Sequence, residues 1–213
     1  MVDGEGQRAA LLPVIRELSA AGVIVSAETY RPEVARACLE AGARVVNITG
    51  AEGTGEIFRA VADHDAAAII CFVQGANVRK VGDLKLGEDH GGALKEYFAR
   101  QVALAEGAGV RRLWLDPGMG FYYGNLKDSA ARVRYQMRTF LETFRLRELG
   151  WPTCHALPHA FEYFEDEVRC AEAFFAVLAI LGRTDLLRTH EVKKVRGVAR
   201  TMACFGPGGG DGR

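Results

Sequence analysis

An acidic residue followed by a glycine-containing turn is the sharpest chemical signal in the sequence. Asp116 ends the apolar run RRLWLD and precedes the stretch PGMG, which closes at Gly120. A Pro-Gly pair forces a tight turn, and glycine lets the backbone approach a bound molecule closely. A carboxylate in this position can accept two N–H donors from the guanidine-like edge of a flat heterocycle. The alternative interpretation is that the Asp116 side chain only caps its own turn.

A second pair of polar residues is suited to an anion. Arg188 lies near the end of the apolar run TDLLRT, and His190 follows two residues later. In extended backbone these side chains project to the same side, and arginine offers a planar fork for phosphate oxygens. We predict an anion site here; the alternative is a surface ion pair between Arg188 and a carboxylate such as Asp185 or Glu191.

Two earlier apolar runs also end in polar residues. Glu28 directly follows GVIVSA, and Asn47 lies near the end of ARVVNI. The carboxyl ends of parallel strands open into the active site of α/β folds. We therefore expect Glu28 and Asn47 to face the same small molecule as Asp116, although Asn47 could equally cap the following segment.

Other chemical patterns are weaker. His155 and His159 have metal-ligand spacing, but Pro158 between them argues against helical geometry, so we predict no metal site. The stretch GAEGTGE lacks both the G-x-G-x-x-G spacing and a following Lys-Ser, which disfavours a dinucleotide site or a P-loop.

A parallel sheet is the element that would position these residues. Short apolar runs alternate with helical patterns, and their continuous rather than alternating character is typical of strands buried on both faces. The six runs are GVIVSA, ARVVNI, AAAIICFV, RRLWLD, PTCHAL and TDLLRT. Helical patterns cover 31–40, 93–107, 126–148, 166–182 and 191–203, and the first helix is QRAALLPVIRELSAAG. This order predicts an α/β fold with right-handed crossovers, as an open sheet or a barrel.

The composition limits the classes of partner. The 213 residues carry 27 Lys and Arg against 27 Asp and Glu, so no global field favours nucleic acid or an anionic membrane. No apolar run approaches the ~18 residues of a membrane span, and the first ten residues show no signal peptide pattern. The five cysteines are scattered, which indicates free thiols rather than a disulfide framework. We expect a cytoplasmic protein.

Four stretches together resemble the dihydropteroate synthase family. They are SAETYRPEVARACLEAGA, VNITG, DPGMGF and RTHEV. The family typically reads S-V-D-T-x-x-x-x-V-A-x-x-A-L-x-x-G-A, I-N-D-V-S-G, D-P-G-I-G-F-x-K and R-V-H-D-V, in the same order. The resemblance runs from about Leu11 to Met202. It implies a (β/α)₈ TIM barrel, here incomplete, with about six βα units and the first two strands absent. The expected domain covers 1–203, and a disordered Gly-rich tail covers 204–213.

The resemblance also implies an activity and a set of site residues. The family condenses a pterin-methyl diphosphate with p-aminobenzoate, so a transferase acting on these or a related amine is expected. Carried over to this sequence, the catalytic residues are Asp116, Arg188 and His190. The substrate-binding residues are Glu28, Asn47, Asp116, Gly120, Phe121, His159, Arg188 and His190.

Departures from the family pattern leave a second interpretation open. The N-V-T-P-D-S-F element and the lysine after D-P-G-I-G-F have no counterpart here, and the S-R-K-S-F element aligns with ALPHAF, where His159 or Ala160 replaces its lysine. The alternative is a non-catalytic pterin-binding homologue, or one subunit of a complex. No tightly bound cofactor is expected, although Mg²⁺ could accompany a diphosphate substrate. The expected macromolecular partner is a second copy, or another chain that completes the barrel.

Overall fold

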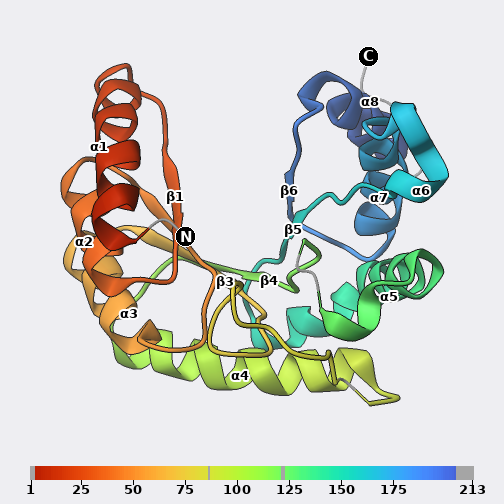
Figure 1. Ribbon diagram of the computed structural model, residues 1–213, viewed down its shortest axis with the longest axis horizontal. Coiled ribbons are helices and arrows are strands. Elements are labelled where there is room, and N and C mark those ends of the chain that lie inside the picture. Colours follow the sequence, from red (N-terminus) through yellow and green to blue (C-terminus); the bar gives the residue numbers. More distant parts are fainter. Residues whose placement is uncertain (1–2, 86, 121–122, 205–213) are drawn as a thin grey trace.

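A computed structural model describes residues 3–85, 87–120 and 123–204 (Figure 1). Its strands are β1 (Ser26–Thr29), β2 (Val45–Ile48), β3 (Ala67–Cys71), β4 (Leu113–Asp116), β5 (Cys154–Ala156) and β6 (Leu186–Arg188). All pairings between these strands are parallel. They form a four-stranded sheet in the order β1-β2-β3-β4 and a two-stranded sheet β5-β6.

The two sheets meet at a single parallel bridge. Leu115 of β4 is bridged to Thr153, and the Leu115 N–H donates to the carbonyl oxygen of Pro152 at 2.9 Å. The six strands therefore follow one another in chain order, as they do in the wall of a barrel. This arrangement confirms the predicted α/β fold with a parallel sheet, in the form of a partial barrel.

The helices cover the outer face of this wall. They are α1 (Gly4–Ala20), α2 (Pro32–Glu40), α3 (Thr54–Asp63), α4 (His90–Gly107), α5 (Ser129–Glu142), α6 (Phe161–Phe164), α7 (Cys170–Leu181) and α8 (Val192–Ala203). Pro32 occupies the first turn of α2, and Asp89 and Asp128 cap α4 and α5 by accepting backbone N–H bonds. Strand β3, which lies between β2 and β4 in the sheet, is buried at every position, as is typical of a central strand in a parallel sheet.

Three details of the helix assignment differ from the sequence prediction. The segment 126–148 is not one helix: α5 ends at Glu142, and a 3₁₀ segment (η2, Thr143–Leu149) follows it. Helix α3 was not predicted, because glycines surround its start and hide the helical period. Helix α6, at four residues, is too short to show any period.

The wall is open between its first and last strands. Among the described residues β1 pairs with β2 alone, and β6 pairs with β5 alone. Figure 1 shows β1 with α1 and α2 in one arm, and β6 with α7 and α8 in the other. Helix α1 buries Ile15 against Val34 and Cys38 of α2, so it packs on the outside of the β1 arm and does not bridge the two edges.

Several sequence predictions concern the surroundings of this core. All five cysteines are free, and Cys38, Cys71 and Cys154 are buried, as expected for a chain without a disulfide framework. Within the described ranges no helix combines the length and apolarity that a membrane crossing needs. The predicted disordered tail, 204–213, lies outside the described residues except for Cys204.

Candidate functional site

Polar side chains from five strands form a hydrogen-bonded row across the carboxyl ends of the wall. We call this set, Glu28, Asn47, Cys71, Asp116 and Arg188, the Asp116 row. Asn47 Nδ2 donates to Glu28 Oε2 at 3.2 Å. The Cys71 thiol lies 3.2 Å from Asn47 Oδ1 and 3.4 Å from Asp116 Oδ2, and Arg188 Nη2 donates to the same Asp116 oxygen.

Strand register brings these side chains to one face. Glu28 is the register partner of Asn47, and Cys71 is the register partner of Asp116. Asn47 is paired with Ile69, so Cys71 lies two residues further along β3 and points to the same side. The predicted strand before Glu28 ended at Ala27, but β1 extends through Thr29, so Glu28 is part of the strand and takes its direction from it.

Asp116 is a turn cap and a member of the row at once. The Gly118 N–H donates to Asp116 Oδ1 at 2.9 Å, and Gly118 has φ of 74°, which favours glycine. The other oxygen, Oδ2, faces Cys71 and Arg188. The two interpretations of Asp116 in the sequence are therefore compatible, because each uses a different oxygen.

Burial dominates the electrostatics of this carboxylate. Asp116 has no exposed surface, and its burial raises the pKa of the carboxyl above the ordinary value. The Arg188 guanidinium and the hydrogen bonds from Gly118 and Cys71 act in the opposite direction. Because burial and these partners act in opposite directions, the pKa of Asp116 depends strongly on which partners it has.

Arg188 does not form the surface ion pair that we considered as the alternative. Its partner is Asp116, whereas Asp185 and Glu191 each pair with another cation. The Arg188 Nε atom is buried and has no hydrogen-bond partner among the described residues. A buried donor of this kind is costly unless something else satisfies it.

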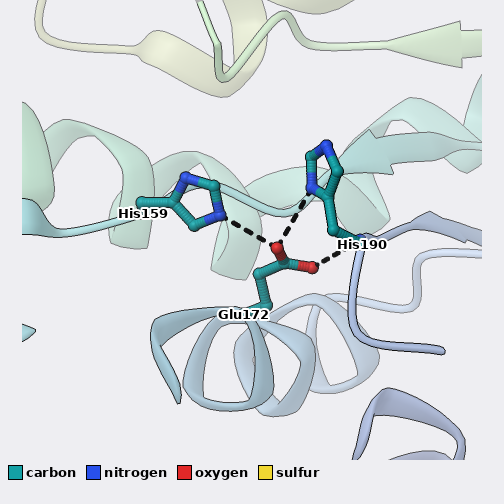
Figure 2. A group of neighbouring side chains, drawn as sticks. All are labelled: His159, Glu172 and His190. Carbon is teal, nitrogen blue, oxygen red and sulfur yellow. Dashed lines mark hydrogen bonds and ion pairs between the residues drawn. The ribbon is translucent and has the colours of Figure 1, made fainter. Parts of the chain in front are cut away.

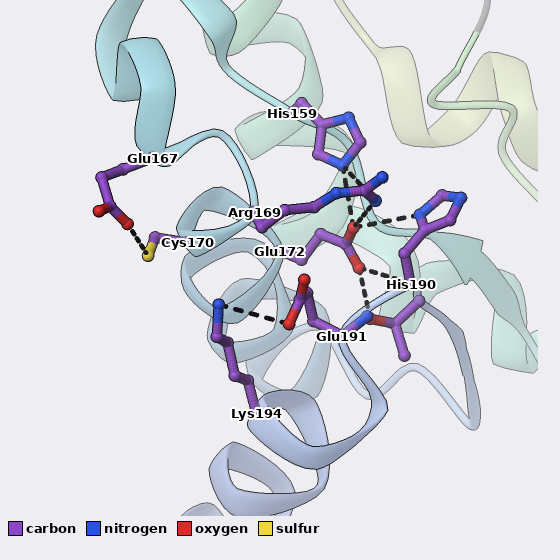
Figure 3. A network of polar contacts seen from close by, with 9 residues as sticks. His159, Glu167, Arg169, Cys170, Glu172, His190, Glu191 and Lys194 are labelled. Atoms are coloured by element: carbon purple, nitrogen blue, oxygen red, sulfur yellow. Dashed lines mark hydrogen bonds and ion pairs between the residues drawn. The ribbon is translucent and has the colours of Figure 1, made fainter.

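A second polar group lies beside the row and is centred on Glu172 in the first turn of α7. We call this set, His159, Arg169, Glu172, Thr189 and His190, the Glu172 cluster. Figure 2 shows the rings of His159 and His190 converging on the carboxylate, with His159 Nε2 at 2.9 Å and His190 Nδ1 at 3.1 Å from Oε1. Arg169 Nη1 lies 3.1 Å from the same oxygen (Figure 3).

The second oxygen of Glu172 is held by the segment after β6. Thr189 Oγ1 donates to Oε2, and the His190 N–H donates to it at 2.9 Å. Burial alone raises the pKa of Glu172, but the hydrogen bonds from Thr189, His159, His190 and Arg169 outweigh it and lower the pKa to about 2. Glu172 is therefore a fully buried carboxylate that stays ionised.

The remaining predicted site residues have different surroundings. His190 contacts Glu172 while Arg188 contacts Asp116, so the two side chains have separate partners. A Cβ added at Gly120 would meet no atom within 4 Å, so no described protein atom requires glycine there. Phe121 lies outside the described residues.

The two histidines with metal-ligand spacing do not meet. His155 is fully buried, its Nε2 lies 2.8 Å from Thr143 Oγ1, and burial together with Arg188 lowers its pKa to about 3. His159 instead faces Glu172.

Sequence reasoning missed four residues of these two groups. Cys71 ends β3 as Asp116 ends β4, so the argument from strand ends could have included it. Glu172, Arg169 and Thr189 carry no such signal, because they lie on a helix or in loops whose approach depends on the tertiary fold.

The fold is a partial parallel barrel, and its polar row lies at the carboxyl ends of the strands. These two features are typical of barrel proteins that bind small molecules at that end of the barrel. Comparison with known proteins narrows the class. The model of a family described as pterin binding enzyme matches residues 1–158. The chain is 26% identical to the type-3 dihydropteroate synthase of Escherichia coli over 203 residues, which cover 92% of this chain and 76% of that protein.

Two further relatives agree. The dihydropteroate synthase of Synechocystis sp. is 35% identical over 151 residues, which cover 66% of this chain and 47% of that protein. The structure of Xanthomonas albilineans dihydropteroate synthase with 4-aminobenzoic acid matches with a TM-score of 0.78 and 26% identity, and the match covers 97% of this chain and 77% of that one. The chain thus spans about three quarters of the E. coli protein and less than half of the Synechocystis protein. It belongs to the pterin-binding family of the dihydropteroate synthases.

Proposed function

We propose that the Asp116 row binds a pterin ring and that the chain acts as a dihydropteroate synthase-type transferase. The observation that carries the proposal is the buried Asp116 carboxylate, which lies in line with Asn47 and Glu28 at the carboxyl ends of β4, β2 and β1. These oxygens are acceptors, and the amino-pyrimidine edge of a pterin presents N–H donors to such a row. Substrate classes named for relatives support this choice: solved dihydropteroate synthases include complexes with 4-aminobenzoate and with 7,8-dihydropteroate.

Arg188 is the proposed contact for the anionic group of the substrate. Its charge is shared with Asp116, yet its buried Nε has no partner among the described residues, and a phosphate oxygen would satisfy that donor. In the proposed reaction the amine nitrogen attacks the methylene carbon, the carbon–oxygen bond breaks, and diphosphate departs with the bonding electrons. Positive charge from Arg188 would stabilise the departing oxygens. We propose His190 and His159, which lie next to Arg188 in the fold, as further contacts of the second substrate or the anion.

A non-catalytic pterin-binding protein is the second candidate. The specific observation in its favour is that His159 or Ala160 stands where the family has a lysine, and His159 is engaged with Glu172. A histidine is not a permanent cation at neutral pH, so it replaces the lysine only in part.

Calorimetric titration with a pterin, with and without pyrophosphate, tests the proposal. Binding that pyrophosphate strengthens supports a shared ring and anion site, whereas no binding in either condition refutes it. Incubation with a pterin-methyl diphosphate and p-aminobenzoate, followed by measurement of released pyrophosphate, then separates the two candidates. Binding without release would identify the non-catalytic protein.

A further inference from the structure

The Glu172 cluster has the composition of a metal site, a role beyond the substrate contacts proposed above for its two histidines. Among the described residues one group of His, Cys, Asp and Glu places its possible ligand atoms within 4.8 Å of one another, and it consists of His159, Glu172 and His190. We propose that these three side chains bind one divalent cation of the Zn²⁺ class.

The separations between the ligand atoms suit such an ion. Glu172 Oε1 lies 2.9 Å from His159 Nε2 and 3.1 Å from His190 Nδ1. Ligands at the usual Zn–N and Zn–O distances stand about 3.3 Å apart in tetrahedral geometry. The ligand atoms of the two imidazoles lie within 4.8 Å of each other, and the His190 side chain is 68% exposed, so its ring has room to adjust to the ion.

The carboxylate is already oriented for coordination. Thr189 and the His190 backbone N–H hold Glu172 Oε2, so the remaining oxygen is directed at the two imidazoles (Figure 2). Donors that fix a ligating carboxylate in this way are a regular feature of protein metal sites. Two imidazoles and one carboxylate favour Zn²⁺ over Mg²⁺, which prefers oxygen ligands alone. Open positions would remain for water or an anionic substrate oxygen.

Arg169 is the competitor for this site. Its Nη1 atom lies 3.1 Å from Glu172 Oε1, the oxygen that would coordinate the ion, and 3.5 Å from His159 Nε2, so it contacts both groups (Figure 3). Its side chain is 45% exposed, so it can turn away into solvent. Because a cation there repels a metal ion, removing it should strengthen metal binding.

Calorimetric titration of the full chain with ZnCl₂ tests the proposal. We expect one ion per chain with micromolar or tighter affinity, and at least about a 10-fold loss in each of His159→Gln, Glu172→Gln and His190→Gln. His64→Gln is the matched control: within the described part of the chain its ring bonds Ala60 of the preceding helix, away from the Glu172 cluster, so the affinity should stay unchanged. The two histidine variants keep the test valid if Glu172→Gln fails to fold.

Two further measurements complete the experiment. Arg169→Ala should bind Zn²⁺ more tightly than the wild-type chain, and an unchanged or weaker affinity counts against coordination by this carboxylate oxygen. Co²⁺ in place of Zn²⁺ should give visible absorption bands that disappear in His159→Gln. Absence of binding, or binding that none of the three ligand variants weakens, overturns the proposal. Binding of the bare pterin ring is a separate measurement, because none of the three ligand residues belongs to the Asp116 row.

Discussion

The two buried carboxylates of this protein, Asp116 and Glu172, have similar partners and opposite electrostatics. Each contacts an arginine, and each has no exposed surface. Asp116 receives hydrogen bonds from Gly118, Cys71 and Arg188, and its pKa is raised.

Glu172 is better supplied with donors. It receives bonds from His159, Arg169, Thr189 and twice from His190, and its pKa is lowered to about 2. Two causes act together: Glu172 has more donors, and it lies nearer the surface beside the exposed side chains of Arg169 and His190, so burial opposes its charge less than it opposes that of Asp116. Asp116 is therefore suited to exchange partners with a ligand, and Glu172 to hold a fixed arrangement.

The largest expected effect concerns the open edges that flank the two regions. The β1 edge adjoins Ile24, which is 77% exposed, and β6 contains Leu186, which is 37% exposed. At ~25 cal/mol per Å², covering several hundred Å² of apolar surface would contribute about 10 kcal/mol. We expect the chain to self-associate, or to take a partner, through these edges.

Light scattering at low micromolar concentration, combined with a thermal melt, measures this association. Ile24→Lys should reduce it, since a lysine at a strand edge opposes pairing. A monodisperse monomer with a sharp, cooperative transition would show that the two regions are stable without closure of the wall.

The second prediction concerns the contribution of Glu172 to the stability of the fold. Glu172→Ala should lower the free energy of unfolding by about 3 kcal/mol, because it removes a buried charge that several donors share. Urea denaturation measures the change. Glu167→Ala is the control, since Glu167 lies in an exposed 3₁₀ turn and its loss should cost less than about 0.5 kcal/mol. Equal effects of the two substitutions would contradict the central role of Glu172.

The third prediction concerns the loss of folding stability at acidic pH. A carboxyl whose pKa falls from 4.5 to about 2 on folding stabilises the protein above pH 4.5, and this contribution is lost as the pH falls toward 2. Its upper limit is about 3 kcal/mol. Glu172→Gln should therefore flatten the dependence of stability on pH between 4.5 and 2.

Two other groups serve as internal controls for this measurement. The pKa of His155 is lowered from 6.5 to about 3 on folding, so the unfolded chain takes up a proton there at a higher pH than the folded chain does. Stability therefore falls as the pH drops from 6.5 to about 3, and this part of the loss should persist in Glu172→Gln. Asp116→Asn should not remove the loss of stability at acidic pH, because the pKa of Asp116 is raised rather than lowered. A smaller loss at acidic pH in Asp116→Asn would mean that Asp116, and not Glu172, is the acid stabilised in its charged form.

The fourth prediction tests Asp116 as the ring contact. Asp116→Asn should weaken pterin binding by about 1.5–3 kcal/mol, the scale of a hydrogen bond to a charged group. Calorimetry on the folded variant measures the loss, and Asp63→Asn, on the exposed end of α3, is the control. Unchanged affinity would remove Asp116 from the binding site.

The smallest effect is expected for Arg188. Arg188→Ala should abolish the strengthening of pterin binding by pyrophosphate, worth about 1.5 kcal/mol, and leave binding of the bare ring nearly intact. Arg147→Ala is the control, because Arg147 pairs with Asp185 away from the row. If the substitution at Arg188 weakened binding equally with and without pyrophosphate, Arg188 would be structural.

The sequence alone determined much of the Asp116 row. Glu28, Asn47 and Asp116 stand at or near the ends of apolar runs, and parallel strands bring such positions to one edge because their side chains alternate with a period of two residues. The Pro-Gly turn after Asp116 was visible for the same local reason, since it depends on residues adjacent in the chain. The family resemblance added His159 and the barrel.

Tertiary structure alone decided which partners these residues take. Arg188 meets Asp116, 72 residues away in the chain, and His159 and His190 meet on Glu172. No local pattern specifies these contacts. Glu172 lies in an apolar helix, where sequence reasoning predicts that a single acidic residue is exposed. The loops that carry both histidines show no hydrophobic periodicity. The folded chain alone brings the first turn of α7 to the segments that follow β5 and β6, where Glu172 bonds His159, Thr189 and His190.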